Sequence, residues 1–261
     1  MINYLKQKLI RTPLYKYALN TQTSIVSLLW SLYPKKRVKD NSTTYVISPY
    51  KTGTTYITSS FSDNISRHEP YHYASFKKLS SGFDNHFIRR LNFLNLKIEA
   101  SGYLSLFVKQ LSENPNTNKL NYICILRKPS SWATSLINYN HHEVDGLINP
   151  NYNWTNEIIW KKHIGVDLSS FFSLSEDEKY ITAEKLIDFY MEFTINTKRL
   201  NNVQYVWIND LKDFTLKLGS SVDEEVIPEN IWIRKGRAKK YIHSNDNRDK
   251  EYDKIVEKFF I

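Results

Sequence analysis

The stretch of the chain best suited to binding an anion is residues 45–61, YVISPYKTGTTYITSSF. It reads as a short strand over residues 45–47, a tight turn that contains Gly53, and a helix that begins near Thr54. The first N–H groups of such a helix have no partner within it, and the helix dipole adds partial positive charge there. A strand, a glycine turn and a helix N-terminus in this order favour binding of a phosphate-like group.

The turn also contains side chains that can donate to an anion, since one lysine and three threonine hydroxyls lie close together in sequence. We expect these residues around the bound group: Tyr50, Lys51, Thr52, Gly53, Thr54, Thr55 and Tyr56. The kinase and NTPase loop has the order G-x-x-x-x-G-K-[ST], with the lysine directly after the last glycine. Here the lysine precedes the only glycine of the loop by two positions, so the match to that loop is poor.

A second set of polar residues follows an apolar run. Residues 120–126, LNYICIL, are almost continuously apolar, which predicts a parallel strand buried on both faces. Arg127 follows directly, and Ser135 lies eight positions further along, on a predicted helix. Arginine can make a two-pronged, charge-assisted contact with a phosphate. Ligands of α/β proteins gather at the carboxyl edge of the sheet, where Arg127 and residues 49–55 are both expected.

These two motifs resemble those of sulfotransferases that use 3′-phosphoadenosine-5′-phosphosulfate (PAPS). The order Pro-x-Lys-x-Gly-Thr-Thr over residues 49–55 is similar to the family's 5′-phosphosulfate loop. The spacing of Arg127 and Ser135 is similar to that of its 3′-phosphate site. The resemblance implies an α/β fold with a central parallel sheet flanked by helices, of the P-loop NTPase-like sulfotransferase type.

A third point of resemblance is Arg234, Lys235 and Gly236, since the family often places such a loop over the 3′-phosphate. The family's second glycine is absent here. The donor implied by all three motifs is PAPS, and the implied chemistry requires no metal ion.

Transfer of a sulfuryl group to a hydroxyl needs a stabilised leaving phosphate and a base for the acceptor proton. Lys51 is suited to the first task. Three residues are candidates for the second. The resemblance puts Glu69 first, because carbohydrate sulfotransferases often carry a Glu-Pro pair after their first helix. Glu99 is second, since cytosolic members carry a histidine there, and His68 is third.

The same region also matches a metal-binding pattern, because His68-Glu69-x-x-His72 has the spacing of zinc proteases. That chemistry requires a continuous helix through the motif. Pro70 lies in its middle, where it removes a backbone donor and clashes with the preceding turn. We therefore expect an extended segment around Glu69 and no metal ion.

Composition and charge set limits on the partners. The chain has 261 residues with 41% hydrophobic content, which is enough for a proper core and predicts one domain over residues 41–261. The net charge of +9 favours an anionic partner. A single cysteine, Cys124, excludes an internal disulfide and a cysteine-based zinc site.

Residues 1–40 are predicted to form a helical, basic extension. Their longest apolar run, residues 25–33, is far shorter than the roughly 20 residues needed to span a bilayer. The surrounding cations would allow peripheral contact with an anionic membrane, but a helix packed on the domain is the favoured explanation of the apolar residues. No signal-peptide pattern is present, so we expect a cytoplasmic protein, with membrane association as an option.

The remaining periodicities predict the other elements. The predicted helices are 54–63, 76–96, 104–111, 182–200 and 249–260, and the further strands are 96–100 and 203–208.

The expected activity is PAPS-dependent sulfation of a carbohydrate or glycolipid, such as a surface-polysaccharide precursor, and not of a nucleic acid. Two other functions stay open: a P-loop-type kinase of a small molecule and a non-catalytic polyanion-binding protein.

Overall fold

The computed structural model describes residues 13–36, 43–141, 154–227 and 240–260. The chain divides into two compact units. Unit 1 consists of Met1–Gln22, Lys128–Glu192 and Arg237–Lys258. Unit 2 consists of Thr23–Arg127, Phe193–Gly236 and Phe259–Ile261. The predicted division at residue 40 stays a prediction.

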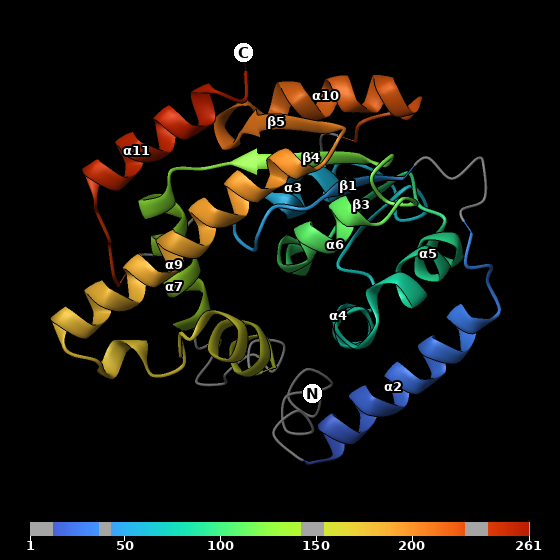
Figure 1. Cartoon of the computed structure of the whole chain (residues 1–261), viewed down its shortest axis with the longest axis horizontal. Helices are drawn as coiled ribbons and strands as arrows, with labels where there is room; N and C mark the ends of the chain where they lie inside the picture. The colour runs from blue at the N-terminus through green and yellow to red at the C-terminus, as the bar shows by residue number, and fades with distance from the viewer. Residues whose placement is uncertain (1–12, 37–42, 142–153, 228–239, 261) are drawn as a thin grey trace. The chain divides into compact units, whose positions relative to one another are not determined.

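Unit 2 is built on a five-stranded sheet in the order β2-β3-β1-β4-β5, and all its pairings are parallel (Figure 1). The strands are β1 (Thr44–Val46), β2 (Ser66–His68), β3 (Ile98–Ala100), β4 (Asn121–Leu126) and β5 (Val203–Trp207). Val46 on β1 pairs with Ala100 on β3 and with Ile123 on β4. The predicted α/β class with a central parallel sheet flanked by helices is therefore confirmed.

The helices and strands alternate along most of the chain. The α-helices are α2 (Pro13–Ser31), α3 (Thr54–Ser59), α4 (His72–Ser81), α5 (Phe83–Leu94), α6 (Val108–Glu113), α7 (Pro129–His141), α9 (Glu176–Asn196), α10 (Leu211–Val222) and α11 (Asp246–Glu257). A π-helical segment covers Thr155–Ile164.

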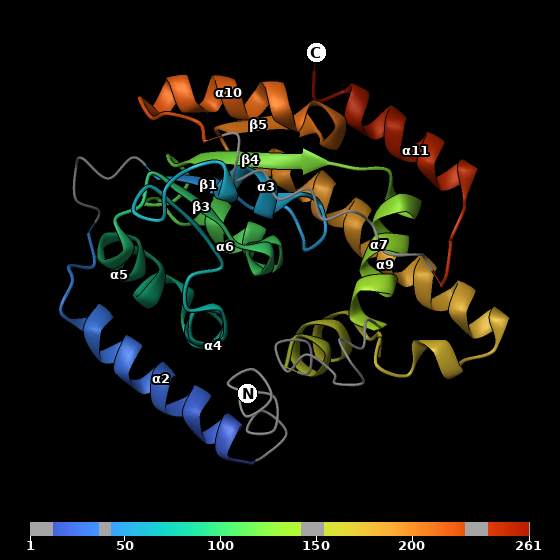
Figure 2. The ribbon, with the colours of Figure 1, turned by 180° about the vertical axis from the view of Figure 1, so that it is seen from behind.

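The sheet of unit 2 is covered on both faces, as a parallel sheet requires. On one face, α3 and α10 pack against alternate strand residues, and α10 runs beside β5 (Figure 2). The buried residues of this layer are Val46, Ile57, Phe61, Ile98, Ala100, Ile123, Ile125, Val206, Leu211 and Leu218. On the other face, Tyr45 contacts Phe87 of α5, with ring centroids 5.3 Å apart. The alternation places successive residues of each strand on opposite faces.

Unit 1 is held together by helices α7, α11 and the part of α9 that belongs to it. The Trp132 ring stacks on Tyr190, with centroids 4.7 Å apart, and Tyr190 contacts Tyr252 at 5.6 Å. All three rings are fully buried. These aromatic contacts give unit 1 a small core of its own.

Several predicted elements differ from the observed ones in length. The predicted helix over 76–96 is two helices, α4 and α5, because the chain is extended at Gly82. Glycine is a poor helix former, so it is a natural place for the break. The predicted helix over 182–200 begins earlier, at Glu176. There Ser175 and Glu178 form a capping box, with the Ser175 N–H donating to Glu178 Oε2 at 2.9 Å.

No helix within the described ranges is both long enough and apolar enough to cross a membrane.

Candidate functional site

The candidate site lies where two neighbouring strands of unit 2 end. In the sheet, β2 and β3 lie on one side of β1, and β4 and β5 lie on the other side. The connection that follows β1 therefore runs in the opposite direction from the connection that follows β4. Ligands of open α/β sheets bind at such a switch in strand order, outside the carboxyl ends. The loop after β1 carries Lys51, and Arg127 directly follows β4. Because β1 and β4 are paired, both motifs of unit 2 reach the same edge of the sheet.

Arg127 contacts the loop directly. Its Nη1 donates a hydrogen bond to the Lys51 carbonyl oxygen at 2.8 Å. The loop is also tied to β4 through Ser48, whose hydroxyl oxygen accepts from the Ile125 N–H at 2.5 Å. The expected proximity of Arg127 and residues 49–55 is present, with one guanidinium N–H used to hold the loop.

The loop has an unusual backbone. Lys51 has φ 69° and Gly53 has φ 104°, both in the left-handed region. A Cβ atom at Gly53 would lie 2.7 Å from Leu211 Cδ1, so space as well as conformation favours glycine there. The Thr52 hydroxyl is buried and donates to the Pro49 carbonyl at 2.7 Å. Thr52 therefore holds the turn through its hydroxyl.

The helix after this loop is shorter than predicted. We expected it over 54–63, but α3 covers only Thr54–Ser59. A helix of six residues has a small dipole, so its N-terminus contributes less to anion binding than the sequence suggested. The lysine and the polar side chains around it are the main electrostatic feature of the site.

The segment around Glu69 is a strand end followed by a strained turn. His68 ends β2, at the edge of the sheet, and His72 is the first residue of α4. Between them Glu69 and Tyr71 both have φ 51°. The continuous helix that the zinc pattern requires is not formed between His68 and His72, as expected from the presence of Pro70. The segment differs from the expected one in that it pairs with β3 before it leaves the sheet.

Strained backbone is concentrated here. In the described part of the chain, five non-glycine residues have positive φ, and three of them are Lys51, Glu69 and Tyr71. The other two, Asn95 and Asp223, end helices, where this conformation is ordinary. Each left-handed residue costs about 1–2 kcal/mol, so the surrounding structure must enforce it. Such clusters are typical of functional sites.

A chain of hydrogen bonds joins the two strained segments. The Tyr50 hydroxyl lies 2.7 Å from His72 Nε2, and His72 Nδ1 lies 3.2 Å from Glu69 Oε2. The His72 ring stacks on Tyr103, with centroids 5.5 Å apart. A Cβ atom at Gly102 would lie 3.0 Å from the Tyr50 ring, so glycine allows that ring to reach His72.

Burial changes the acid–base properties of this chain. Burial raises the pKa of Glu69 to about 8, and a hydrogen bond from the Gly102 backbone offsets part of the effect. Burial, with the neighbouring charge of His68, lowers the pKa of His72 to about 3. The Glu69 side chain is 14% exposed, and its Oε1 atom is buried without a well-formed hydrogen bond to any described residue. A carboxyl group in this state takes up and releases a proton at pH values around 8.

His68, the third candidate base, contacts the helix that follows the loop. Its Nε2 lies 3.2 Å from both the Thr54 and the Thr55 hydroxyl oxygens. Its Nδ1 lies 3.8 Å from Glu69 Oε2. His68 thus lies between the first two threonines of α3 and Glu69.

Glu99, the second candidate base, is used in a buried ion pair. Arg90 Nη1 and Nη2 donate to the two carboxylate oxygens at 2.7 and 2.8 Å, and the Ser101 hydroxyl donates to Oε1 at 2.6 Å. Both side chains of the pair are almost completely buried. Removing a proton from an acceptor would require Glu99 to break this pair, which is costly. The geometry therefore favours Glu69 over Glu99.

Ser135 lies on α7, in unit 1. Its neighbours on that helix bind the chain near its C-terminal end: the Thr134 hydroxyl accepts from the His243 N–H at 2.9 Å, and Asn138 Oδ1 accepts from the Lys240 N–H at 2.8 Å. Arg234, Lys235 and Gly236 lie outside the described residues. The parts of the expected 3′-phosphate site that belong to these segments stay predictions.

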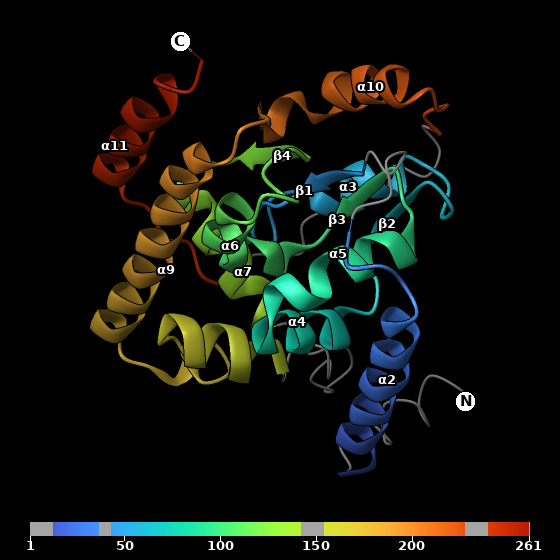
Figure 3. The ribbon, with the colours of Figure 1, turned by 45° about the vertical axis from the view of Figure 1, so that its right-hand side comes forward.

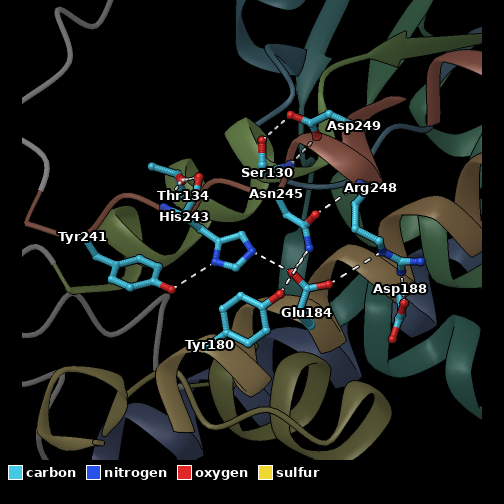
Figure 4. A network of polar contacts seen from close by, with 10 residues as sticks. All are labelled: Ser130, Thr134, Tyr180, Glu184, Asp188, Tyr241, His243, Asn245, Arg248 and Asp249. Carbon is cyan, nitrogen blue, oxygen red and sulfur yellow. Dashed lines mark hydrogen bonds and ion pairs between the residues drawn. The ribbon is translucent and has the colours of Figure 1, made fainter. Parts of the chain in front are cut away.

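Unit 1 contains a second polar cluster, centred on His243 and Glu184 (Figure 4). His243 Nε2 lies 2.8 Å from Glu184 Oε1, and the Tyr241 hydroxyl lies 3.1 Å from His243 Nδ1. Asn245 Nδ2 also donates to Glu184 Oε1, at 2.9 Å, and Arg248 forms an ion pair with Asp188. Sequence reasoning did not find this cluster.

A cavity of about 690 Å³ lies in unit 2 at the opposite edge of the sheet, near the amino ends of the strands. Thr44, Asn121 and Val203 line it. Lys97, also at this cavity, is engaged with Glu224 Oε1 at 2.5 Å. Since α/β sheets bind ligands at their carboxyl edge, the cluster around Lys51 is the stronger candidate.

No protein-family model, curated protein or solved structure matches this chain.

Proposed function

We propose that this protein is a sulfotransferase that moves a sulfuryl group from PAPS to a hydroxyl of a carbohydrate or glycolipid, on a P-loop-related sulfotransferase fold. The observation that carries the proposal is the arrangement at one sheet edge in unit 2. There Arg127 binds the Lys51 loop, and the loop is joined through Tyr50 and His72 to the buried carboxylate of Glu69.

The residues at this edge fit a donor with a phosphosulfate group. PAPS supplies a sulfuryl group on a good leaving phosphate. Lys51 would stabilise the negative charge that develops on the bridging oxygen when the bond from that oxygen to sulfur breaks. Arg127 would fix the loop through the Lys51 carbonyl and add positive charge beside it.

Glu69 would take the acceptor proton as the acceptor oxygen forms its bond to sulfur. Its buried Oε1 makes no well-formed hydrogen bond to a described residue, so this oxygen is the one we assign to accept the proton. With a pKa of about 8, Glu69 is mostly protonated at neutral pH, so the transfer rate should rise as the pH rises through 8.

His72 would position Glu69. It is neutral, because its pKa is lowered to about 3. With Glu69 ionised, Nδ1–H donates to the carboxylate and Nε2 accepts from the Tyr50 hydroxyl, which fixes the ring and its tautomer. Tyr50 thereby links the loop to the base.

Ligand binding and turnover test the proposal together. Adenosine 3′,5′-bisphosphate should raise the melting temperature of the protein, and ATP with magnesium should raise it much less. PAPS-dependent sulfation of a carbohydrate or glycolipid mixture should be lost in Lys51→Ala and in Arg127→Ala. Only Arg127→Ala should also weaken binding of the bisphosphate severely, because it removes the arginine expected at the 3′-phosphate. Lys51→Ala keeps Arg127 and the backbone carbonyl that Arg127 binds.

Lys109→Ala is a matched control, since Lys109 is an exposed residue of α6 that pairs only weakly with Glu113, at 3.9 Å. It should behave as the wild type. Equal PAPS turnover in the wild type and in Arg127→Ala would refute the site. A shift with ATP and none with the bisphosphate would favour a kinase.

A further inference from the structure

The positive charge of the chain is concentrated at one end. Residues 1–39 contain eight Lys and Arg residues and no Asp or Glu. The whole chain has 36 basic and 27 acidic residues, so residues 40–261 have 28 and 27 and are almost neutral. The net charge of +9 therefore does not describe the protein surface in general. It describes the segment that contains α2.

The part of α2 from Thr23 onward belongs to unit 2, where it lies near α4 (Figure 3). Val26 and Trp30 are buried, and they form a cluster with Ala74 of α4. Tyr71 and Phe93 pack against the same cluster. The expectation that an apolar helix face packs on the domain is therefore met by this side of α2.

A second apolar face of α2 is exposed. Ile25, Leu28 and Leu29 of α2 follow the spacing i, i+3 and i+4, and Leu32, directly after the last residue of the helix, continues the stripe at i+7. Leu28 is 67% exposed and Leu32 is 75% exposed. Isolated exposed leucines are ordinary, but a continuous stripe of four large aliphatic residues marks an interaction surface.

Cations lie at the end of this stripe. Lys35 and Lys36 follow α2 and are exposed, and the sequence continues with Arg37 and Lys39. A helix with an exposed apolar stripe and flanking lysines is suited to the boundary between lipid headgroups and acyl chains. A second copy of the chain would add another N-terminal segment with eight cations and no acidic residue, so charge disfavours self-association through this face.

We propose that α2 attaches the protein to the surface of an anionic lipid bilayer. Ile25, Leu28, Leu29 and Leu32 insert among the headgroups, while Lys35 and Lys36 contact lipid phosphates. Val26 and Trp30 keep the helix on unit 2 at the same time. This attachment goes beyond the proposed activity and does not depend on it.

Vesicle flotation tests the attachment. The full-length protein should float with vesicles of equal parts phosphatidylglycerol and phosphatidylcholine, and weakly or not at all with pure phosphatidylcholine. Leu28→Ser combined with Leu32→Ser should weaken partitioning at least about 100-fold, because each lost leucine contributes roughly tenfold or more. Lys35→Gln combined with Lys36→Gln should weaken it roughly 25-fold, about fivefold for each cation near the surface.

The control replaces two exposed apolar residues elsewhere, Ile181→Ser with Leu216→Ser, which should float like the wild type. All the substituted residues are exposed, so each variant should keep its thermal unfolding midpoint, which is measured alongside. Absence of flotation with the anionic vesicles would overturn the proposal. So would equal flotation of the α2 double leucine variant and the wild type. A wild-type dimer in sedimentation that the leucine variant converts to a monomer would assign the face to a second copy instead.

Discussion

The two units contain the same three residue types in the same order of contact, tyrosine to histidine to glutamate. In unit 2 the order is Tyr50, His72 and Glu69, with contacts of 2.7 and 3.2 Å. In unit 1 it is Tyr241 and His243 followed by Glu184, with contacts of 3.1 and 2.8 Å. The histidine is used in opposite ways, since His72 faces its glutamate with Nδ1 and His243 faces its own with Nε2.

The surroundings of the two glutamates differ. Glu184 accepts from Asn245, and its Oε2 lies 3.6 Å from Arg248 Nε (Figure 4). Its charge is therefore compensated by a cation and by an amide hydrogen bond. Glu69 has no Lys or Arg partner among the ion pairs of the described residues, and Oε1 lacks a well-formed hydrogen bond. Its backbone is also left-handed.

This difference separates a stabilising cluster from a reactive one. A satisfied buried network rigidifies the structure around it, as the one at His243 does for the segment before α11. A buried carboxylate with an unsatisfied oxygen and strained backbone lowers stability and is retained where its proton chemistry is needed. The shared sequence of contacts, from tyrosine to histidine to glutamate, does not by itself distinguish the two clusters.

The largest expected effect is on turnover. Glu69→Gln should lower PAPS-dependent transfer by about 10²- to 10⁴-fold, since the base is removed and the shape is kept. The same change at Glu184 is the matched control. Glu184→Gln should leave turnover within about twofold and lower the unfolding free energy by about 1–3 kcal/mol, because Arg248 and His243 lose a charged partner. If both variants turned over alike, the assignment of roles to the two clusters would be wrong.

A second expected effect is on the pH dependence of stability. Between its ordinary pKa of 4.5 and about 8, Glu69 is protonated in the folded protein and ionised in the unfolded chain, so stability falls as the pH rises. His72 acts in the opposite sense between about 3 and its ordinary value of 6.5. Above pH 6.5 the Glu69 effect stands alone. It should lower the unfolding free energy by roughly 2 kcal/mol by pH 8.

Urea unfolding at pH 6.5 and pH 8 measures this effect as a difference between the wild type and Glu69→Gln. The other titrating groups are common to both proteins and cancel in the comparison. The variant should lack the roughly 2 kcal/mol loss. Parallel profiles for the two proteins would show that Glu69 ionises normally.

The two clusters also differ in how far sequence could predict them. The meeting of Lys51 and Arg127 was predictable, because residues that follow parallel strands converge at one edge. The resemblance indicates Glu69, but the sequence pattern indicates its partner His72 only as a zinc ligand. The pairing of His243 with Glu184 spans 59 positions and has no local signal.

The same reason explains Glu99. The sequence around Glu99 matches that of a candidate base. Arg90 neutralises the Glu99 carboxylate because α5, which carries Arg90, packs on the face of β3 that carries Glu99. The start of α9, by contrast, could have been found from sequence. Its Ser175-x-x-Glu178 pattern is a local signal for a capping box.

The smallest expected effect concerns the two tyrosines. Tyr50→Phe removes the hydroxyl that binds His72 Nε2, which loosens the ring that orients Glu69. Transfer should fall by up to about tenfold, with KM for PAPS nearly unchanged, since a positioning contact of this size contributes about 1 kcal/mol. Tyr241→Phe removes the corresponding hydroxyl from His243 and should change the unfolding midpoint without changing turnover. Because the two substitutions delete the same atom from the same kind of contact, a loss of turnover in Tyr50→Phe alone would identify His72 as the residue through which the loop acts on the base. An equal loss in both, or in neither, would leave Glu69 without a positioning role for Tyr50 and His72.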